Sequence, residues 1–449
     1  MPDTNLPVTE PAVRDQLEAA PYLSLTARSR SLVSEAFIQS LLEAATSWER
    51  QSGCRAKGRG PKSIQSLRIA LEGLCGGLLL NGSVGAAWSY RPTDSKAFTG
   101  GAISYRTFSA ALEAAKAAGW VEVKDGFRQF LAPKGGDGWS PARNWAPRFR
   151  LTPHFLSLAA PHGLYPENAA DHFALVPETA AKNLLVLKKP SARAGHLKVT
   201  GSGLTFHRTA ESDRLLDEVV EVNSFIAGHT IAGCLPVQLR RIFNGGWDRG
   251  GRWYALGASN YQGMKKEDRL GITINGADVV EVDVKASYLT CLYGRLGINM
   301  DGDPDPYAVT DLPREVVKAF VTATLGNGSP ISRWPKGCAE DLTAKGIRLK
   351  DFPAGLVGKA VLGRHPVLGD LKRLGMTWDR LMNLEALAIT IAMLTLKREW
   401  GAVALPVHDS VIVESKFLDQ ACNSLRAGYR LVVGAEPKLE PRLKKIHLR

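Results

Sequence analysis

The chain has 449 residues, of which 45% are hydrophobic and 22% are charged. This length is too great for one hydrophobic core, so we expect two or three domains, and the composition excludes a disordered or fibrous protein. Lysine and arginine outnumber aspartate and glutamate by 57 to 44, a formal net charge of +13, which favours polyanionic partners such as DNA or RNA.

The cysteines and the apolar stretches exclude several other classes of protein. Six cysteines are spread along the chain without a CxxC pair, which argues against a zinc ribbon or dithiol motif and fits a reducing cytosol. Residues 2–15 are acidic and contain prolines, unlike a signal peptide. The longest apolar stretches, such as 384–396, are too short or too charged to span a bilayer. We therefore expect a cytoplasmic protein with no membrane partner, and the sequence indicates no oligomeric state.

We expect residues 1–30 to form a flexible arm and residues 31–165 to form a small domain. Amphipathic helices are expected over 31–51 and 63–82, separated by a basic, glycine-rich loop over 55–62. Ser104 is a predicted N-cap for a third helix, which Gly119 ends. A strand over 120–124, a tight turn at Asp125-Gly126 and a returning strand over 127–131 should then form a β-ribbon.

This order of helices and ribbon resembles a winged helix-turn-helix. The resemblance implies that Tyr105, Arg106 and Thr107 open a recognition helix that enters the major groove, with Lys124 and Arg128 in a wing along the backbone. We therefore expect Arg106, Lys124 and Arg128 to bind DNA. A dimerisation or protein-contact module is the alternative.

Residues 166–244 predict a helical connector. Apolar residues recur at helical spacing over 212–228, which is typical of a packing helix. The first half of the chain offers no cluster of acidic residues of the kind that a proofreading exonuclease needs, so we expect none.

Two carboxylates in the second half predict a metal site. A short β-run over 279–283 ends at Asp283, and two further β-runs over 404–415 meet at His408, Asp409 and Ser410. A strand that ends in a carboxylate and a hairpin with a carboxylate at its tip can bring the two acids side by side. Hard cations take oxygen ligands, so the pair suits two Mg²⁺ ions, with Mn²⁺ as a substitute, and such ions stabilise the attacking and leaving oxygens of an in-line displacement.

A cationic helix is predicted between these two carboxylates, over 312–328, with Pro313 in its first turn. One face carries Val317, Phe320, Val321 and Thr324, whereas Arg314 and Lys318 share the neighbouring face one turn apart. Like charges at this spacing repel unless an anion lies between them. The pair therefore indicates a site for a nucleoside triphosphate.

Taken in order, these segments resemble the palm and fingers of family A DNA polymerases and of phage-type single-subunit RNA polymerases. The resemblance covers about residues 245–415. It implies that Asp283 belongs to motif A, Arg314 and Lys318 to motif B, and His408 with Asp409 to motif C. The segment 251–263 is similar to the Gly-Arg-x-Tyr element of the RNA polymerases, which implies that Arg252 and His408 face the primer–template.

Several positions depart from the family pattern. Thr322 and Leu325-Gly326 stand where the family has an aromatic residue and Tyr-Gly, and Ser410 after Asp409 is typical of RNA polymerases. Five residues after Asp283, Tyr288 stands where DNA polymerases place a bulky residue that clashes with a ribose 2′-OH. We give this last feature more weight and expect deoxynucleotides.

The sequence therefore predicts an α+β protein, with a compact right-hand-like polymerase palm and fingers over 245–449 after an N-terminal winged-helix domain and a helical connector. The expected function is template-directed nucleotidyl transfer on a DNA template and primer with nucleoside triphosphates, as in a DNA polymerase of a phage, plasmid or mobile element. A single-subunit RNA polymerase or primase is one alternative. A non-catalytic DNA-binding replication or regulatory protein with a degenerate palm is another.

Overall fold

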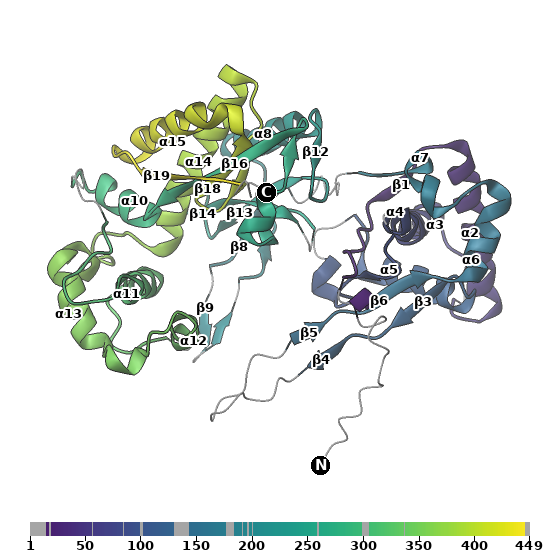
Figure 1. Ribbon diagram of the computed structural model, residues 1–449, viewed down its shortest axis with the longest axis horizontal. Helices are drawn as coiled ribbons and strands as arrows, with labels where there is room; N and C mark the ends of the chain where they lie inside the picture. The colour runs from purple at the N-terminus through teal and green to yellow at the C-terminus, as the bar shows by residue number, and fades with distance from the viewer. Residues whose placement is uncertain are drawn as a thin grey trace, which may run out of the picture. The chain divides into compact units, whose positions relative to one another are not determined.

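A computed structural model of the chain divides into two compact units (Figure 1). The first comprises Met1–Ala181, Cys234–Gln238 and Leu256–Gly263, and the second comprises Lys182–Gly233, Leu239–Ala255 and Met264–Arg449. The structure describes residues 15–17, 19–55, 57–83, 85–98, 102–129, 143–176, 184–190, 192–194, 197–199, 201–257, 260–298, 305–335 and 337–444. About half of the predicted arm over 1–30 therefore lies outside the described residues.

The first unit is built on helices that pack around one apolar core. Its larger helices are α2 (Leu32–Gln51), α3 (Pro61–Leu71), α4 (Gly77–Ser83) and α5 (Tyr105–Ala117), with a π-helical turn, Glu72–Gly76, joining α3 to α4. Ser31 and Ser104 cap α2 and α5 by accepting backbone N–H bonds, which confirms the predicted cap at Ser104. Helices α2, α3 and α5 contact one another, and Phe37, Leu71 and Phe108 are buried among them.

The continuous helical stretch Pro61–Ser83 is long and apolar enough to cross a membrane by length and composition alone. In this structure 61% of its most apolar window is buried. Leu67, Leu74 and Leu78 belong to the core of the first unit, so packing within the unit accounts for the apolar composition.

The predicted ribbon of this unit is paired differently from our expectation. Strand β3 (Val121–Lys124) pairs with β6 (Arg148–Leu151), which also pairs with β2 (Ser89–Tyr90), whereas β4 (Phe127–Gln129) pairs with β5 (Arg143–Trp145). The expected hairpin turn at Asp125-Gly126 is therefore wrong. Gly126 lies so close to the opposite backbone that a Cβ atom would stand 2.3 Å from the carbonyl oxygen of Trp145. The chain accordingly continues past Gly126 along residues 143–151 instead of turning back.

We expected residues 166–244 to form a helical connector, but the described part of this segment is not mainly helical. Its described residues include the long helix α8 (Ala210–Ala227) and several short strands, and the segment is divided between the two units. Strand β7 (Phe173–Leu175) pairs with β1 (Ala27–Ser29), which fixes this segment to the first unit. The remaining helices of the first unit are α6 (Pro153–Ala159) and α7 (Ala169–His172).

Among its described residues, the second unit contains two larger sheets and a two-stranded one. One has the strand order β11-β8-β13-β14, in which only β8 and β13 are parallel. Its strands are β8 (Leu185–Lys188), β11 (Gly203–Leu204), β13 (Leu239–Asn244) and β14 (Gly250–Ala255), and α8 packs on it. Strand β9 (Ala192–Ala194) pairs antiparallel with β10 (Leu197–Val199), apart from this sheet.

The other sheet is antiparallel and has β16 (Ala277–Lys285) at its centre. One edge of β16 pairs with β18 (Ser410–Glu414), which continues to β17 (Leu405–Val407). The other edge pairs with β15 (Thr273–Ile274) and then with β19 (Lys438–Leu443), and β15 also pairs with β12 (Ile231–Ala232). Val279, Val280 and Val282 are buried, so β16 is covered on both faces.

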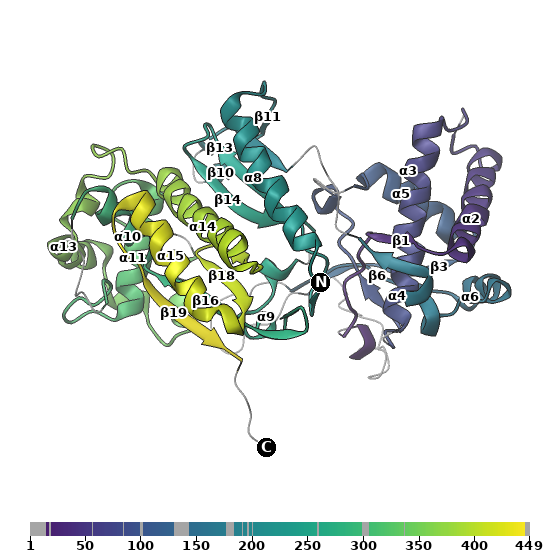
Figure 2. The ribbon, with the colours of Figure 1, turned by 90° about the horizontal axis from the view of Figure 1, so that it is seen from above.

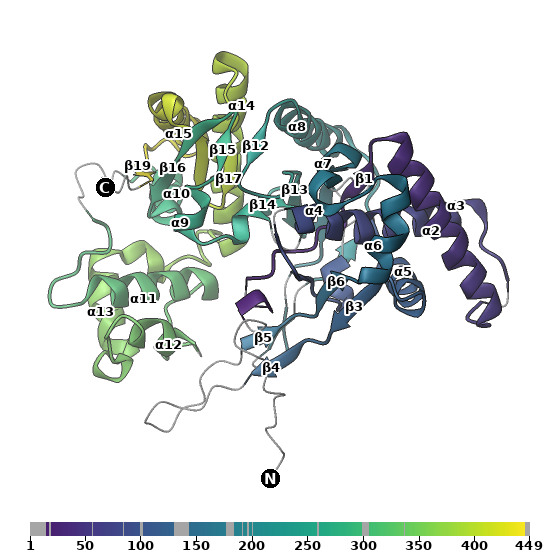
Figure 3. The ribbon, with the colours of Figure 1, turned by 45° about the vertical axis from the view of Figure 1, so that its right-hand side comes forward.

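Helices cover this sheet and form a cluster beside it. Helices α14 (Trp378–Trp400) and α15 (Leu418–Val433) lie side by side across one face (Figure 2). Helix α10 (Ser287–Arg295) follows β16 directly, and α9 (Lys266–Arg269) precedes β15. Helices α11 (Arg314–Asn327), α12 (Cys338–Thr343) and α13 (Ala354–Arg364) form a group in which α11 also contacts α14 (Figure 3). The expected α+β class is confirmed.

Candidate active site

The two predicted carboxylates lie at adjacent positions of the antiparallel sheet. Asp283 on β16 stands directly opposite Ser410 on β18, and Asp409 precedes Ser410 in the turn between β17 and β18. The backbone N–H of Val284 donates to the carbonyl oxygen of Asp409 at 3.1 Å. The expected strand and hairpin are therefore present, and they bring the two acids together.

The backbone is unusual beside both carboxylates. His408, immediately before Asp409, has φ 56°, and Ala286, three residues after Asp283, has φ 49°. Left-handed backbone costs a residue with a Cβ atom about 1–2 kcal/mol, so the surrounding fold must impose it. At Ala286 it redirects the chain from β16 into α10, and at His408 it makes a two-residue turn that leaves Asp409 at the tip.

Both carboxylates are harder to ionise than an ordinary aspartate. Burial raises the pKa of Asp283, the charge of Asp409 raises it further, and Arg442 and Lys266 oppose the shift. Burial also raises the pKa of Asp409, against the opposing effects of its own backbone N–H, Arg252, Lys318 and Lys266. A pair of partly desolvated carboxylates is stabilised by added positive charge.

The donor chemistry of this pair fits a hard divalent cation, because it consists of carboxylate oxygens whose burial outweighs the nearby cations and raises the pKa of both groups. Among the residues that the structure describes, no group of three or more His, Cys, Asp or Glu side chains is arranged to hold a metal. Asp283 and Asp409 would thus have to be completed by water, backbone or substrate oxygens. Polyphosphate substrates commonly supply such oxygens to Mg²⁺.

Buried side chains hold the hairpin against β16. Glu281, two residues before Asp283, accepts hydrogen bonds from Arg269 at 2.9 and 2.8 Å. The Ser410 hydroxyl lies 3.1 Å from Glu281 Oε1 and 2.9 Å from the carbonyl oxygen of Val407. Ser410, which we compared with RNA polymerases on sequence alone, therefore has a local role in fixing the position of Asp409.

Arg252 is held beside the carboxylates by a buried acid. Its Nε and Nη2 donate to Glu385 Oε1 on α14 at 2.7 and 2.5 Å. Ser287 donates to the other oxygen of Glu385 at 2.6 Å and lies 2.7 Å from the Tyr429 hydroxyl. Burial raises the pKa of Glu385 to about 7, and Arg252 opposes that shift. The Arg252 charge also acts on Asp409, so this network connects α14 to the carboxylate pair.

Tyr288 lies between Arg252 and an aromatic side chain. The Arg252 guanidinium is 5.4 Å from the centre of its ring, and Trp378 packs edge-on with ring centres 4.7 Å apart. The Tyr288 hydroxyl is buried and has no hydrogen-bond partner in the structure. Burial, followed by the charge of Glu385, raises the pKa of Tyr288, so the ring is a neutral, bulky wall of the site.

The cationic helix is confirmed as α11, with Val317, Phe320, Val321 and Thr324 buried on one face. Arg314 and Lys318 are both exposed. Arg314 Nε donates to Asp305 at 2.5 Å, whereas Lys318 is the cation of the pair that acts on Asp409. Their charged groups lie 5.2 and 6.0 Å from the ring centre of Tyr307.

His408 is exposed at the tip of the turn. Desolvation and the nearby guanidinium groups of Arg252 and Arg269 lower the pKa of His408, which keeps the ring neutral near pH 7. A neutral imidazole can both donate and accept a hydrogen bond.

The predicted DNA-binding residues lie in the first unit. Arg106 is exposed in the first turn of α5, Lys124 is half-buried at the end of β3, and Arg128 falls on β4. The side chain of Arg128 lies outside the described part of the chain. The winged-helix interpretation and DNA contact by these residues stay predictions.

Sequence reasoning missed several residues of the site. Glu385 had a signal, because an acid within the apolar stretch 384–396 has to be paired when that stretch is buried. Tyr307 and Lys266 had none. Arg442 is the most notable omission: it comes from the C-terminal strand β19 and donates to Asp283 Oδ2 at 2.7 Å.

Comparisons with known proteins assign no role to the residues of this site. No protein-family model matches the chain. No curated protein matches it either. Among solved structures, it is similar to the POL domain of Pol1 from M. smegmatis in complex with DNA primer-template and dNTP, with 10% identity and a TM-score of 0.30 over 95% of this chain and 67% of that chain. A TM-score this low does not establish a common fold.

Proposed function

We propose that the chain is a template-directed nucleotidyltransferase, a DNA-dependent DNA polymerase of a phage, plasmid or mobile element. The observation that carries the proposal is the juxtaposition of Asp283 and Asp409 across the β16–β18 pair, with the Lys318 charge acting on Asp409 from α11. Two carboxylates and a cation from a separate helix are the parts that nucleotidyl transfer needs: oxygen ligands for metal ions and positive charge for a triphosphate.

Asp283 and Asp409 would hold two Mg²⁺ ions. Bound there, the ions would supply Lewis acidity to the reacting phosphate and to the attacking and leaving oxygens. The rigid turn at His408 and the Glu281–Ser410 contact fix the relative position of the two carboxylates before any substrate binds. Such preorganisation avoids rearrangement during the reaction.

Lys318 and Arg314 would bind the triphosphate. The Lys318 charge already acts on Asp409, whereas Arg314 would exchange Asp305 for a phosphate oxygen. The Arg314–Asp305 pair is partly exposed, so its rupture costs little, about 1 kcal/mol or less. The Tyr307 ring supports both cations.

Tyr288 would contact the sugar of the incoming nucleotide and exclude a 2′-OH by bulk. Its ring is fixed between Arg252 and Trp378, so it cannot easily move aside. Arg252, held by Glu385, and the neutral His408 would face the primer–template. In the first unit, Arg106, Lys124 and Arg128 would bind duplex DNA in a winged-helix arrangement.

Primer extension tests the proposal. Wild-type protein and Asp409→Ala would be incubated with Mg²⁺ and either dNTPs or NTPs, on primed and on unprimed templates. We expect the wild type to extend a primer with dNTPs and the variant to fail. Incorporation of NTPs alone, or without a primer, would favour an RNA polymerase or primase. No incorporation of either, with wild type and variant alike, would favour a DNA-binding protein with a degenerate palm.

The sugar preference has a separate test in Tyr288→Ala and Tyr288→Phe. The Ala variant should accept NTPs about 10- to 100-fold better relative to dNTPs, as kcat/KM ratios, because the steric wall is removed. The Phe variant should keep the wild-type ratio, because the hydroxyl has no partner. An unchanged ratio in the Ala variant would exclude Tyr288 as the determinant.

A further inference from the structure

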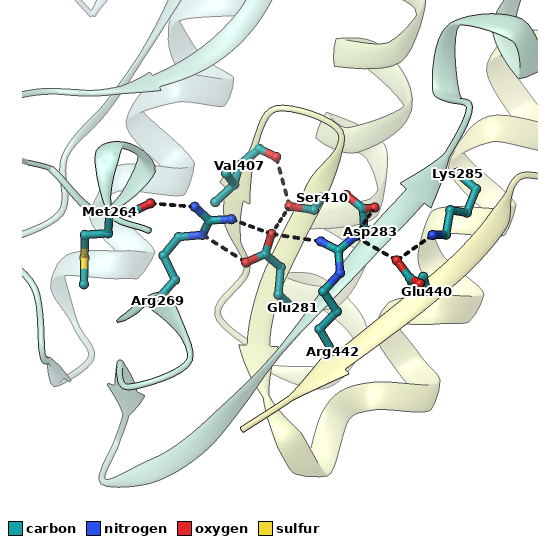
Figure 4. A network of polar contacts seen from close by, with 9 residues as sticks. All are labelled: Met264, Arg269, Glu281, Asp283, Lys285, Val407, Ser410, Glu440 and Arg442. Carbon is teal, nitrogen blue, oxygen red and sulfur yellow. Dashed lines mark hydrogen bonds and ion pairs between the residues drawn. The ribbon is translucent and has the colours of Figure 1, made fainter. Parts of the chain in front are cut away.

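The C-terminal strand places an arginine on the candidate metal site. Strand β19 pairs antiparallel with β16, so that Glu440 stands opposite Asp283 and Arg442 stands opposite Glu281. Figure 4 shows the Arg442 side chain reaching from β19 toward Asp283. Its Nη2 donates to Asp283 Oδ2 and to Glu440 Oε2, each at 2.7 Å.

Arg442 is only partly satisfied in this position. Its other terminal nitrogen, Nη1, is buried, makes no hydrogen bond and lies 4.0 Å from Glu281 Oε1. Glu281 already accepts two hydrogen bonds from Arg269, so it offers Arg442 little more. Glu440 also forms an ion pair with Lys285 at 2.6 Å (Figure 4). Its carboxylate is therefore a second acidic partner for Arg442 beside Asp283.

This arrangement sets a guanidinium and a metal ion in competition for one carboxylate. An oxygen of Asp283 that accepts a short, charge-assisted hydrogen bond is less available as a metal ligand. A guanidinium and a divalent cation at the same carboxylate also repel each other. Glu440 gives the guanidinium another acceptor on the same side of the β16–β19 pair, so Arg442 can leave Asp283 without losing every partner.

We propose that Arg442 is a positioning residue that competes with a divalent ion for Asp283 and keeps Glu440 as its acceptor when the ion binds, so that β19 sets the ion affinity of the site. This inference rests on the proposed function, because it takes Asp283 and Asp409 as the metal ligands. Its new element is the Arg442–Glu440 pair, which tunes the ligands without being one of them.

Metal binding measured directly tests the inference. Mn²⁺ would be titrated into the full-length protein and the free ion followed by electron paramagnetic resonance, for wild type, Arg442→Gln, Arg442→Lys, Glu440→Gln and the double variant Arg442→Gln/Glu440→Gln. Arg442→Gln should bind Mn²⁺ about three- to tenfold more tightly, as expected when one partly exposed charge-assisted competitor is removed. Arg442→Lys keeps the positive charge that repels the ion and should stay within about twofold of wild type.

Glu440→Gln distinguishes an anchor from a ligand. As an anchor for Arg442, Glu440 should matter only while Arg442 is present. Glu440→Gln should therefore weaken Mn²⁺ binding a few-fold in the wild-type background and have no effect in the Arg442→Gln background, a double-mutant cycle. An equal loss of affinity in both backgrounds would mean that Glu440 acts on the ion without Arg442, as a ligand or through its charge, and would overturn the inference.

Control variants separate failure of this inference from failure of the proposed function. Arg373→Gln removes an exposed arginine paired with Asp370 in the same unit and should leave Mn²⁺ binding unchanged. If wild-type binding is abolished by Asp409→Asn but Arg442→Gln has no effect, the metal site stands and the inference fails. If no variant binds Mn²⁺ in a manner that depends on Asp409, both fail. Thermal denaturation of each variant confirms that the fold is retained.

Discussion

The burial of Asp283 and Asp409 lowers the stability of the fold when their carboxyl groups are ionised. Each sits in a partly desolvated position, and burial is the largest cause of its raised pKa. A carboxylate on the surface carries no such desolvation cost, and proteins commonly accept such a cost where a group serves function. Strained backbone at Ala286 and His408 adds to the same cost.

The raised pKa of Asp409 makes a prediction about stability. For a carboxyl whose folded-state pKa exceeds its unfolded value, the folded state binds more protons, so stability falls as pH rises from the ordinary value of 3.8 through the raised one. Asp409→Asn cannot ionise and should therefore have a higher Tm than wild type at pH 7 in metal-free buffer, with the difference vanishing below about pH 3.8. Differential scanning calorimetry across pH would show this. A lower Tm at pH 7 would mean that Asp409 is a stabilising ion-pair partner.

At the residue scale, the residues that could be predicted from the sequence are those that a short local pattern specifies. Asp283, Asp409 and Lys318 could be proposed from the sequence because each lies at a recognisable place on a strand, hairpin or helix. Arg442 was missed because its role depends on the register between β16 and β19, which are far apart in the chain. Arg314 was placed on the correct helix, but its pairing with Asp305 depends on a loop whose conformation no short pattern specifies.

At the scale of elements, α14 acts as the support of the site. Its Glu385 is 1% exposed and is bonded to Arg252 and Ser287, while Tyr429 of α15 closes the network. A buried acid with these partners must remain paired, because an unpaired charge in the same place is strongly destabilising.

Glu385→Gln should destabilise the protein, because it leaves the Arg252 guanidinium without its counter-charge. We expect a loss of about 2–3 kcal/mol in the free energy of unfolding, since the amide still accepts one hydrogen bond. Urea denaturation measures this. Glu221→Gln is the matched control: its pairs with Lys397 and Arg398 are more exposed than the Arg252–Glu385 pair, so its effect should not exceed about 1 kcal/mol. Equal effects of the two substitutions would refute a special role for Glu385.

Helix α11 makes a different prediction, about substrate binding. Lys318→Gln should raise the KM for the nucleotide about tenfold or more, because the amide cannot pair with a phosphate as the ammonium group does, while Tm changes little at this exposed position. Lys359→Gln, on the exposed face of α13, is the control and should behave as wild type. Steady-state kinetics with a fixed primer–template would show the difference. An unchanged KM in Lys318→Gln would remove α11 from the nucleotide site.

The elements themselves were predicted unevenly. Helix α11 and the β17–β18 hairpin have strong local signals, namely a proline at the start, a glycine stop and a turn between two β-runs, and they form as expected. The turn at Asp125-Gly126 had an equally strong signal and is absent. Gly126 serves close approach to the backbone of Trp145 instead of a reversal, and the two uses of glycine look alike in sequence.

At the scale of the whole molecule, the surplus of positive charge is the property that bears on the predicted nucleic-acid partner. The net charge of +13 favours binding to nucleic acid without indicating where. The division into a helical unit and a unit with two larger sheets could not be located from composition, because the segment 166–244 mixes strands of both.

The salt dependence of DNA affinity tests whether the first unit binds DNA. Arg106→Gln/Lys124→Gln should weaken duplex binding and reduce the slope of log Kd against log salt by about two, nearly one for each cation that no longer neutralises a phosphate. Fluorescence anisotropy at several salt concentrations would measure the slope. A slope equal to that of wild type would place DNA binding elsewhere on the chain.

The most direct measurement of the central claim is single-nucleotide incorporation under single-turnover conditions, comparing wild type with Asp283→Asn, Asp409→Asn and both together. Two carboxylates that act as one metal site should each lower the rate about 10³-fold or more when substituted, and the double variant should be little worse than either single one. Asp370→Asn, at an exposed ion pair, should match wild type. Near-wild-type rates in either single variant would contradict the assignment of the site.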